Sequence, residues 1–500
     1  MAGFQIPLII RGEIIEDYEI EYHDRSGEGG SFITPNIRKY LNKLVVKSPA
    51  ALEDLYRINF DEIFDYLDEL RQRLDLKTNK YWQHAFDVAC HSSNLSRGVL
   101  EAIFLNSPKA LARDNVRRIA ETQIGINYLE GWVRTARWDG RMIDVRAVGT
   151  RAVHVIAGNV PVVPITTLLR NAITRSDAIV KTPSNDPVTM GAIARTMIEM
   201  APAHPLTRHL SVAYWKGGDE TVEEVLYRPQ NIERIVAWGG FASIKHITKY
   251  LQPGIDLIPL EPKSSTTLIG KEALTDDATM REVARRVAAD LGGLDQEACT
   301  NARVMFLESG TDEAGIALAN KFGELLFRAV QELPPNISGG PTKFDPALKA
   351  ELQAISQQED FYRIFTEHGR TDKTGAVIVS QLSEQVDFPS LLYGRVGNIV
   401  PVDQIDEALN SFSAATKAAG IFPDELRTRL RDKGALMGGQ SFMPIGYATI
   451  GAAGVGPNDG IEPERRMCRW AVDLSVDPKI MPGPWMREEE IAALLQTAAA

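Results

Sequence analysis

Apolar residues recur at helical spacing through the first part of the chain, from Pro35 to about Gly131. The stretch "FDEIFDYLDELRQRLDL" places apolar residues three and four positions apart, which is the spacing of one face of an α-helix. Residues 1–130 are therefore predicted to form a helical N-terminal region.

After residue 131 the pattern changes to short β-branched runs that alternate with amphipathic stretches. "RMIDVRAVGTRAVHVIAGNVPVVP" predicts strands that lead into a turn, and further strands are predicted in "AIVK", "HLSVAYW" and "RIVAW". Helices are predicted between them in "ITTLLRNAITR", "VTMGAIARTMIEM" and "DETVEEVLY". Such alternation is typical of an α/β fold, with a parallel sheet covered by helices on both faces.

A second alternating block begins at "IDLIPLEPKSSTTLIG". It continues through the helix "TDDATMREVARRVAADLGG", which has acidic residues near its start and ends at Gly292. A short polar connector with Cys299 follows, and then the strand "RVMFLE". The whole pattern predicts two α/β lobes after the helical region.

Composition and charge narrow the classes of partner. A net charge of -11 without a long basic stripe argues against nucleic acid and anionic membranes as main partners. No apolar run reaches the roughly 20 residues of a membrane span, and the start of the chain lacks the basic region of a secretory signal. A cytoplasmic location is therefore expected.

Three cysteines without metal-ligand spacing exclude a disulfide framework and a zinc cluster.

Cys299 stands out among these cysteines because of its neighbours. A free cysteine is most often a small buried residue, and packing is the predicted role of Cys90 and Cys468. Cys299 instead lies in the polar segment "DQEACTN", and an irregular segment at the edge of a sheet is where chemistry concentrates. We therefore interpret Cys299 as a candidate nucleophile.

A nucleophilic thiolate needs stabilisation, and its attack needs donors for the oxyanion that forms. None of the eight histidines is marked by local sequence as the base of a cysteine protease. Asn159, at a predicted strand end in "HVIAGNVPVVP", is a candidate oxyanion donor, and a turn residue that bonds its own backbone is the alternative.

Taken in order, "AGNVPVVP", "AIVKTPSNDP", "RIVAWGGFASI", "DQEACTNARV" and "NDGIEPERRMCRWAVD" resemble the aldehyde dehydrogenase superfamily and, within it, the LuxC-type acyl-CoA reductases. The resemblance implies a Rossmann-type cofactor domain at 131–257, joined by the returning segment 435–500, and a catalytic domain at 258–434. The helical region would then pack on the cofactor domain. It also implies a catalytic pair and a set of cofactor-binding residues, namely Cys299 and Asn159 for catalysis and Lys181, Ser184, Gly239 and Gly240 for the cofactor.

Two departures from the superfamily pattern bear on the direction of the reaction. Glu261 is the nearest candidate for the glutamate that activates water, but alignment on Lys263 places Pro259 at that position. A missing water activator suits an enzyme that keeps its thioester intermediate dry. Ser184 stands where NAD-preferring relatives often carry a glutamate, which favours NADPH over NADH because a serine does not repel a 2′-phosphate.

The resemblance implies NADPH-dependent reduction of a fatty acyl-CoA to the aldehyde through an acyl-cysteine intermediate. Alternatives are an NAD(P)-dependent aldehyde dehydrogenase that oxidises with Glu261 as base, and an acyl-accepting subunit that needs an acyl-activating ligase. Expected partners are acyl-CoA or an acylated protein and further copies of the chain, as a homodimer or homotetramer paired through the flap "RWDGRMIDVRAVG".

Overall fold

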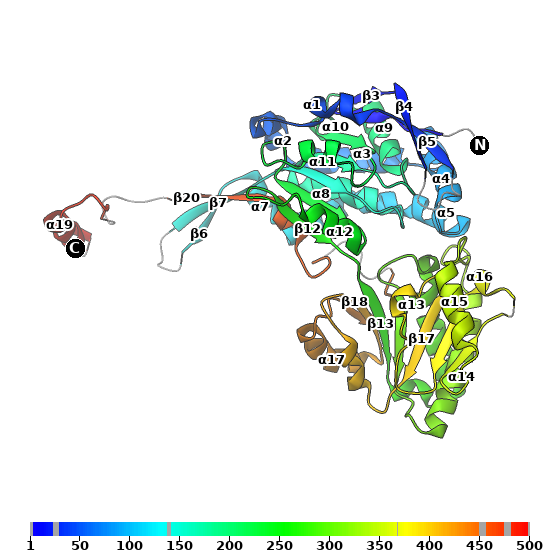
Figure 1. Ribbon diagram of the computed structural model, residues 1–500. Helices are drawn as coiled ribbons and strands as arrows, with labels where there is room; N and C mark the ends of the chain where they lie inside the picture. The colour runs from blue at the N-terminus through cyan, green and yellow to red at the C-terminus, as the bar shows by residue number, and fades with distance from the viewer. Residues whose placement is uncertain are drawn as a thin grey trace.

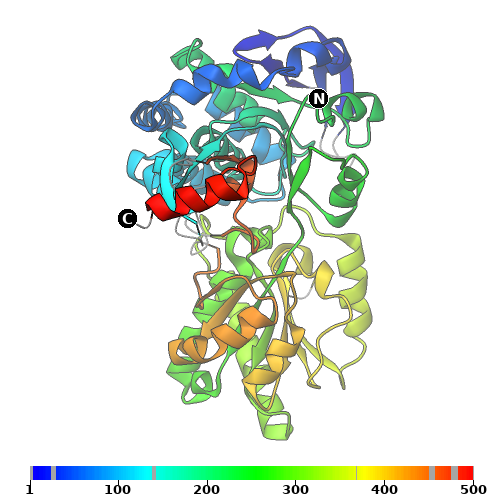
Figure 2. The same ribbon diagram turned by 90° about the vertical axis from the view of Figure 1, so that its left-hand side faces the viewer.

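Two seven-stranded sheets form the centres of two lobes in a computed structural model of the chain (Figures 1 and 2). The structure describes residues 4–23, 30–137, 142–367, 369–449, 457–474 and 482–498. Helices cover both sheets, so the predicted α/β fold is confirmed.

The first sheet has the strand order β12-β11-β8-β9-β10-β2-β3. Strands β8 to β12 are parallel, and the chain proceeds outward from β8 to β9 and β10 on one side and to β11 and β12 on the other. This reversal between β8 and β11 is the topological switch point at which open α/β sheets bind ligands. The strands are β12 (Asp256–Leu260), β11 (Arg234–Trp238), β8 (Arg151–Val155), β9 (Asp177–Lys181), β10 (Leu210–Ala213), β2 (Leu8–Ile10) and β3 (Glu13–Ile15).

Helices from two parts of the chain cover the first sheet. The N-terminal helices α2 to α7 share one hydrophobic core with α8 and α9, and α1, α11 and α12 pack on the other face. In α3 the apolar residues of one face are buried, and the Asn59 side chain caps its start by accepting from the Glu62 N–H at 2.8 Å. These helices are α1 (Leu41–Leu44), α2 (Glu53–Arg57), α3 (Phe60–Arg73), α4 (Lys80–Ser92), α5 (Arg97–Asn106), α6 (Arg113–Gln123), α7 (Ile126–Glu130), α8 (Val163–Thr174), α9 (Thr189–Met200), α10 (Pro205–Arg208), α11 (Glu220–Leu226) and α12 (Phe241–Thr248).

The predicted helical region 1–130 is not helical at its start. Strands β1 (Phe4–Gln5), β4 (Tyr18–His23) and β5 (Ser31–Pro35) form a small sheet, and β2 pairs antiparallel with β10 in the first sheet. All three residues of β2 are buried. The run is too short for its periodicity to predict a strand, and its partner lies 200 residues away in sequence.

The second sheet has the order β15-β16-β17-β14-β13-β18-β19 and is parallel except for β15. Helices α13 and α14 share its core on one face. The strands are β15 (Tyr362–Phe365), β16 (Ala376–Ser380), β17 (Val396–Pro401), β14 (Ala302–Leu307), β13 (Ser264–Ile269), β18 (Thr416–Phe422) and β19 (Phe442–Pro444). The helices of this lobe are α13 (Asp277–Gly292), α14 (Glu313–Gln331), α15 (Pro346–Ile355), α16 (Thr371–Thr374) and α17 (Asp424–Leu436).

The chain crosses between the lobes through short connectors. Residues 261–263 lead directly from the carboxyl end of β12 into the amino end of β13, so these two sheet edges face each other. The predicted return of the chain to the first lobe at residue 435 is too early, because β19 still belongs to the second sheet. Within the described residues the return consists of 457–474, with α18 (Pro463–Met467) and β20 (Arg469–Asp473).

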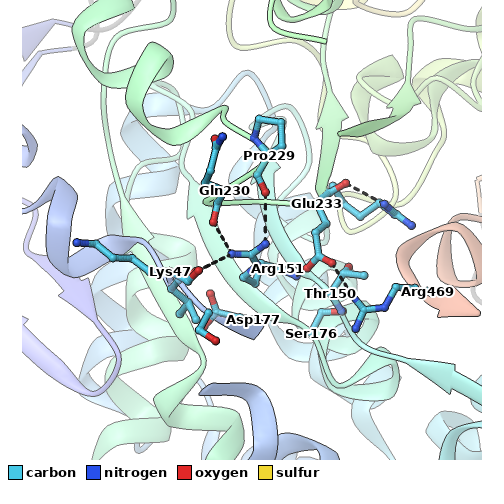
Figure 3. A network of polar contacts seen from close by, with 12 residues as sticks. Lys47, Thr150, Arg151, Ser176, Asp177, Pro229, Gln230, Glu233 and Arg469 are labelled. Atoms are coloured by element: carbon cyan, nitrogen blue, oxygen red, sulfur yellow. Dashed lines mark hydrogen bonds and ion pairs between the residues drawn. The ribbon is translucent and has the colours of Figure 1, made fainter. Parts of the chain in front are cut away.

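A polar network centred on the buried Arg151 fixes the returning segment at the amino end of β8 (Figure 3). Glu233 accepts from the Nε of Arg151 at 3.2 Å and from a guanidinium N–H of Arg469 at 2.8 Å. Arg151, which is 5% exposed, also donates to the carbonyls of Val46 and Gln230. The network therefore joins the N-terminal region, the first sheet and β20 at the edge opposite to the switch point.

Strand β20 pairs with β7 (Met142–Val148), which pairs with β6 (Val133–Ala136), and this sheet extends away from both lobes (Figure 1). Of its strands, β7 lies within the predicted flap, residues 137–149, of which 138–141 lie outside the described part. Helix α19 (Glu488–Ala498) lies beyond the end of this arm. None of the helices in the described ranges has the length and apolar character to cross a membrane.

Candidate active site

The backbone that leads to Cys299 has an unusual conformation. Leu294, Asp295 and Gln296 have φ angles of 52°, 51° and 65°, which is the left-handed region. For residues with a Cβ atom this region costs roughly 1–2 kcal/mol each. Three consecutive residues of this kind persist only where surrounding contacts enforce them, and such places are often functional.

Those contacts come from three buried polar side chains. Asp295 accepts from the backbone N–H groups of Ser96, Gly339 and Gly340 at 2.7 to 2.9 Å. The Gln296 amide donates to the Val396 carbonyl and accepts from its N–H, both at 2.8 Å.

Asn301 holds the other end of the loop. Its amide nitrogen donates to the carbonyls of Asp290 at 3.0 Å and Gly293 at 2.8 Å, and its oxygen accepts from the Ala298 N–H at 3.0 Å. The sequence indicated that this polar segment lies outside the core, whereas Asp295, Gln296 and Asn301 are at most 1% exposed. Their polarity serves to satisfy buried backbone groups, which sequence pattern alone does not reveal.

Cys299 is half-buried in a turn at the amino end of β14. Its carbonyl accepts from the hydroxyl of Ser265 on β13 at 2.8 Å. Burial raises the pKa of the thiol, the Lys417 cation opposes this rise, and Asp459 adds to it, while Arg303 also lowers the pKa. The nucleophile predicted from sequence therefore lies in a site with nearby charges of both signs.

The structure brings Asn159 to the nucleophile loop. Asn159 follows the carboxyl end of β8, is exposed, and donates from Nδ2 to the Glu297 carbonyl at 2.8 Å. The preceding Gly158 leaves no room for a side chain, since a Cβ there would lie 2.3 Å from the Asn185 Oδ1. The second N–H of the Asn159 amide is available for another acceptor, because an amide nitrogen carries two protons.

Glu297, two residues before Cys299, was not predicted as a functional residue. Burial raises the pKa of its carboxyl group to about 7, Asp295 contributes to the rise, and a hydrogen bond with Asn94 and the charge of Arg303 oppose it. A carboxyl group that titrates near neutral pH is typical of a functional site. Nothing in its local sequence separates it from the other acidic residues, because the shift comes from tertiary burial.

Glu261 lies on the connector between the lobes and is exposed. Its carboxylate lies 3.3 Å from the ammonium of Lys263, which also donates to the Ala414 carbonyl at 3.0 Å. The charges that act most on the Cys299 thiol are those of Lys417, Asp459 and Arg303 rather than that of Glu261. Pro259 is part of β12, where it pairs with Ala237.

The predicted cofactor residues follow the carboxyl ends of neighbouring strands. Val155 at the end of β8 pairs with Lys181 on β9 and with Ala237 on β11, and Gly239 and Gly240 follow β11 directly. These residues therefore lie on both sides of β8, next to the switch point. Ser184 lies in the half-buried loop after β9.

The amino end of α12 is open and fits a phosphate. No atom lies within 4 Å of the position where a Cβ of Gly240 would be, and Phe241 is 75% exposed. The first N–H groups of a helix lack partners within it and carry a partial positive charge, which favours a pyrophosphate. The Lys181 ammonium lies 5.6 and 5.5 Å from the ring centres of Tyr214 and Trp215, so it is held at this edge. These features fit a nicotinamide dinucleotide.

Comparison with known proteins agrees with this architecture. The family model described as acyl-CoA reductase (LuxC) matches residues 55–470. A long-chain acyl-protein thioester reductase of Vibrio harveyi is 25% identical over 481 residues, covering 93% of this chain and 92% of its own. One of Photorhabdus laumondii is 30% identical over 322 residues, 63% of this chain and 62% of its own.

Solved structures of similar fold include several dehydrogenases. Lactaldehyde dehydrogenase from Escherichia coli superposes with a TM-score of 0.70 at 14% identity, covering 94% of this chain and 99% of its own. An aldehyde dehydrogenase of Mycobacterium tuberculosis complexed with NAD+ gives a TM-score of 0.70 at 14% identity, with 97% and 100% coverage. A glyceraldehyde-3-phosphate dehydrogenase of Bacillus halodurans complexed with NADP gives 0.68 at 13% identity, with 94% and 100% coverage.

Proposed function

Because this chain belongs to the acyl-CoA reductase (LuxC) family, we propose that it reduces a fatty acyl thioester to the aldehyde through a covalent intermediate on Cys299. The observation that carries this proposal is the position of Cys299 on a loop held by three buried polar side chains and contacted by Asn159 from the opposite lobe. This contact supports a site to which one lobe contributes the thiol and the other lobe contributes the candidate oxyanion donor.

The thiolate of Cys299 attacks the carbonyl carbon of the substrate thioester. The tetrahedral intermediate carries a negative oxygen, which the second N–H of Asn159 and the backbone N–H of Cys299 stabilise. Collapse of this intermediate expels the substrate thiolate and leaves an acyl group on Cys299. Reduction of that acyl group gives a thiohemiacetal, whose collapse releases the aldehyde and restores the thiolate.

We place the cofactor in the first lobe, at the switch point. Gly239, Gly240 and the amino end of α12 would hold the pyrophosphate, and Lys181 and Ser184 would contact the adenosine ribose. NADPH bound there would supply the hydride for the acyl group, and NADH is the alternative donor. Ser184 in place of a carboxylate supports NADPH, because it leaves a 2′-phosphate unopposed.

The contacts of Glu261 favour reduction over hydrolysis. Its exposed carboxylate lies 3.3 Å from the ammonium of Lys263 and is not among the charged groups that act on the Cys299 thiol, which supports an acyl-enzyme without a water-activating base. The alternative, an oxidising aldehyde dehydrogenase, uses Glu261 as the base. It predicts net formation of acid from aldehyde and NADP+.

The acyl group can reach Cys299 from CoA or from an acylated protein. The name of the relatives, acyl-protein thioester reductase, supports a protein donor, and an acyl-activating ligase is then the partner. We further propose that the arm formed by β6, β7 and β20 pairs copies of this chain into a homodimer or homotetramer.

The proposal is tested with a panel of acyl-CoAs and NADPH, following NADPH oxidation and aldehyde together. We expect one aldehyde per NADPH oxidised, no turnover with Cys299→Ala, and near-normal turnover with the matched control Cys90→Ala. Formation of acid instead of aldehyde would favour the oxidising alternative. No product from any acyl-CoA, together with product from an acylated ligase, would assign the donor to the protein partner.

A further inference from the structure

Strand β13 contains an irregularity at Ser265, the residue whose hydroxyl holds the Cys299 carbonyl. On one side, the single step from Ser265 to Thr266 is opposed by two steps on β14, from Ala302 to Val304. On the other side, two steps on β13 are opposed by three on β18, from Thr416 to Ala419. Each neighbouring strand therefore has one extra residue beside Ser265. Bulges are rare in parallel pairs and are often found next to active sites, where they redirect a side chain.

Each of these extra positions presents a cation. The additional residue on β14 is Arg303, and the bulged interval on β18 contains Lys417. The Lys417 side chain is 8% exposed and donates to Asn458 at 2.6 Å and to Asp459 at 2.5 Å. Within the described residues, the Nε of Arg303 is buried without a hydrogen-bond partner, while another of its N–H groups donates to the Ser390 carbonyl at 2.9 Å.

Ionisable groups on the neighbouring elements surround this pair of cations. Asp459 of the returning segment faces Lys417, and its side chain is 6% exposed. Glu297 and Tyr393 lie near Arg303, which affects the ionisation of both. Of the ionisable groups nearby, Lys417, Asp459 and Arg303 are the ones with the largest effect on Cys299.

We propose that Lys417 and Arg303 are positioning residues that stabilise the Cys299 thiolate from two sides, and that Asp459 limits the effect of Lys417. This inference rests on the proposed function, because it concerns the same thiol. The β-bulges place Arg303 and Lys417 on the two strands that flank Ser265, whose hydroxyl holds the Cys299 carbonyl. Burial keeps the charges of both cations from being screened by water. The proton of the thiol leaves to solvent when the thiolate forms.

The rate of alkylation of Cys299 by iodoacetamide, followed against pH on the intact chain by peptide mass spectrometry, tests this inference without substrate or cofactor. We expect the midpoint of the profile to rise by about one pH unit in Lys417→Met and in Arg303→Met, which is about tenfold slower alkylation below the midpoint. Lys417→Arg should retain the wild-type midpoint. Asp459→Asn should move the midpoint down and speed alkylation.

Midpoint shifts of opposite sign in Lys417→Met and Asp459→Asn would indicate an electrostatic effect. A disturbed loop would instead move the midpoint of both variants in the same direction. The matched control is Lys263→Met, another buried lysine of this sheet edge, which should leave the midpoint unchanged. Unchanged midpoints in both cation variants, or equal shifts in the control, would overturn the inference. Failure of the proposed function would instead appear as wild-type protein with a normal alkylation profile and no aldehyde from any thioester.

Discussion

Asn159 of the first lobe contacts the nucleophile loop of the second lobe. Its amide donates one N–H to the Glu297 carbonyl at 2.8 Å, and this hydrogen bond orients the amide toward the nucleophile loop. We expect Asn159→Ala to lower kcat by 10²- to 10³-fold, roughly 3 kcal/mol, because one donor to the oxyanion is lost. The alkylation rate of Cys299 should stay close to that of the wild type. A decrease in kcat of less than fivefold would contradict the assignment.

At the scale of elements, the nucleophile loop depends on Asn301, which is fully buried and bonds to both ends of the loop. Asn301→Ala leaves several buried backbone groups without partners, each costing about 1–3 kcal/mol. We expect at least about 2 kcal/mol lower unfolding free energy by urea denaturation, together with loss of turnover. The neighbouring Thr300→Ala is the matched control, with a change within about 0.5 kcal/mol. Equal stability of the two variants would refute this role.

The start of α9 carries a pH dependence. Asp186 is buried, one carboxyl oxygen accepts from the N–H and hydroxyl of Thr189, and burial raises its pKa to about 6. Because folding raises this pKa, the contribution of Asp186 to the unfolding free energy is complete below pH about 4. It is lost as the pH rises through 6. The loss should amount to about 3 kcal/mol. Urea denaturation from pH 4 to 8 should show a smaller decrease in Asp186→Asn. Parallel profiles for variant and wild type would contradict this account.

Elements with local signals were predictable from the sequence, and those set by distant pairing were not. The hydrophobic pattern correctly predicted the positions of four elements, namely β8, α8, α13 with its Asp276 cap, and β14. The position of Cys299 before β14 followed from the polar connector. Strand β2 and the bulges at Ser265 depend on partners far along the chain, so no local pattern could indicate them or the cations that they present.

At the scale of the whole molecule, a buried ion pair anchors the returning segment to the first lobe. Glu464 on α18 accepts from the Nε of Arg170 on α8 at 2.9 Å, with side chains 8% and 4% exposed. Removing one partner leaves the other charge buried, so Glu464→Ala should cost about 3–5 kcal/mol in unfolding free energy. The double variant Arg170→Met with Glu464→Leu should recover most of this unfolding free energy. Glu462→Ala, which removes an exposed pair with Arg465, should cost at most about 1 kcal/mol. Similar losses for Glu464→Ala and Glu462→Ala would contradict this role.

The arrangement of the lobes accounts for a reaction that needs a thiol, an oxyanion donor and a dinucleotide at one place. The carboxyl ends of β8, β9 and β11 bring Asn159 and the candidate cofactor residues to one edge, and the amino ends of β13, β14 and β18 bring Cys299 to the facing edge. The short connector 261–263 keeps these two edges together.

The most direct test of the covalent mechanism is intact and peptide mass spectrometry of the protein incubated with a fatty acyl-CoA in the absence of NADPH. The account predicts one acyl group per chain on the peptide that contains Cys299, and its release as aldehyde when NADPH is added. Aldehyde formation without an acyl adduct on Cys299, or an adduct confined to Cys90 or Cys468, would contradict it.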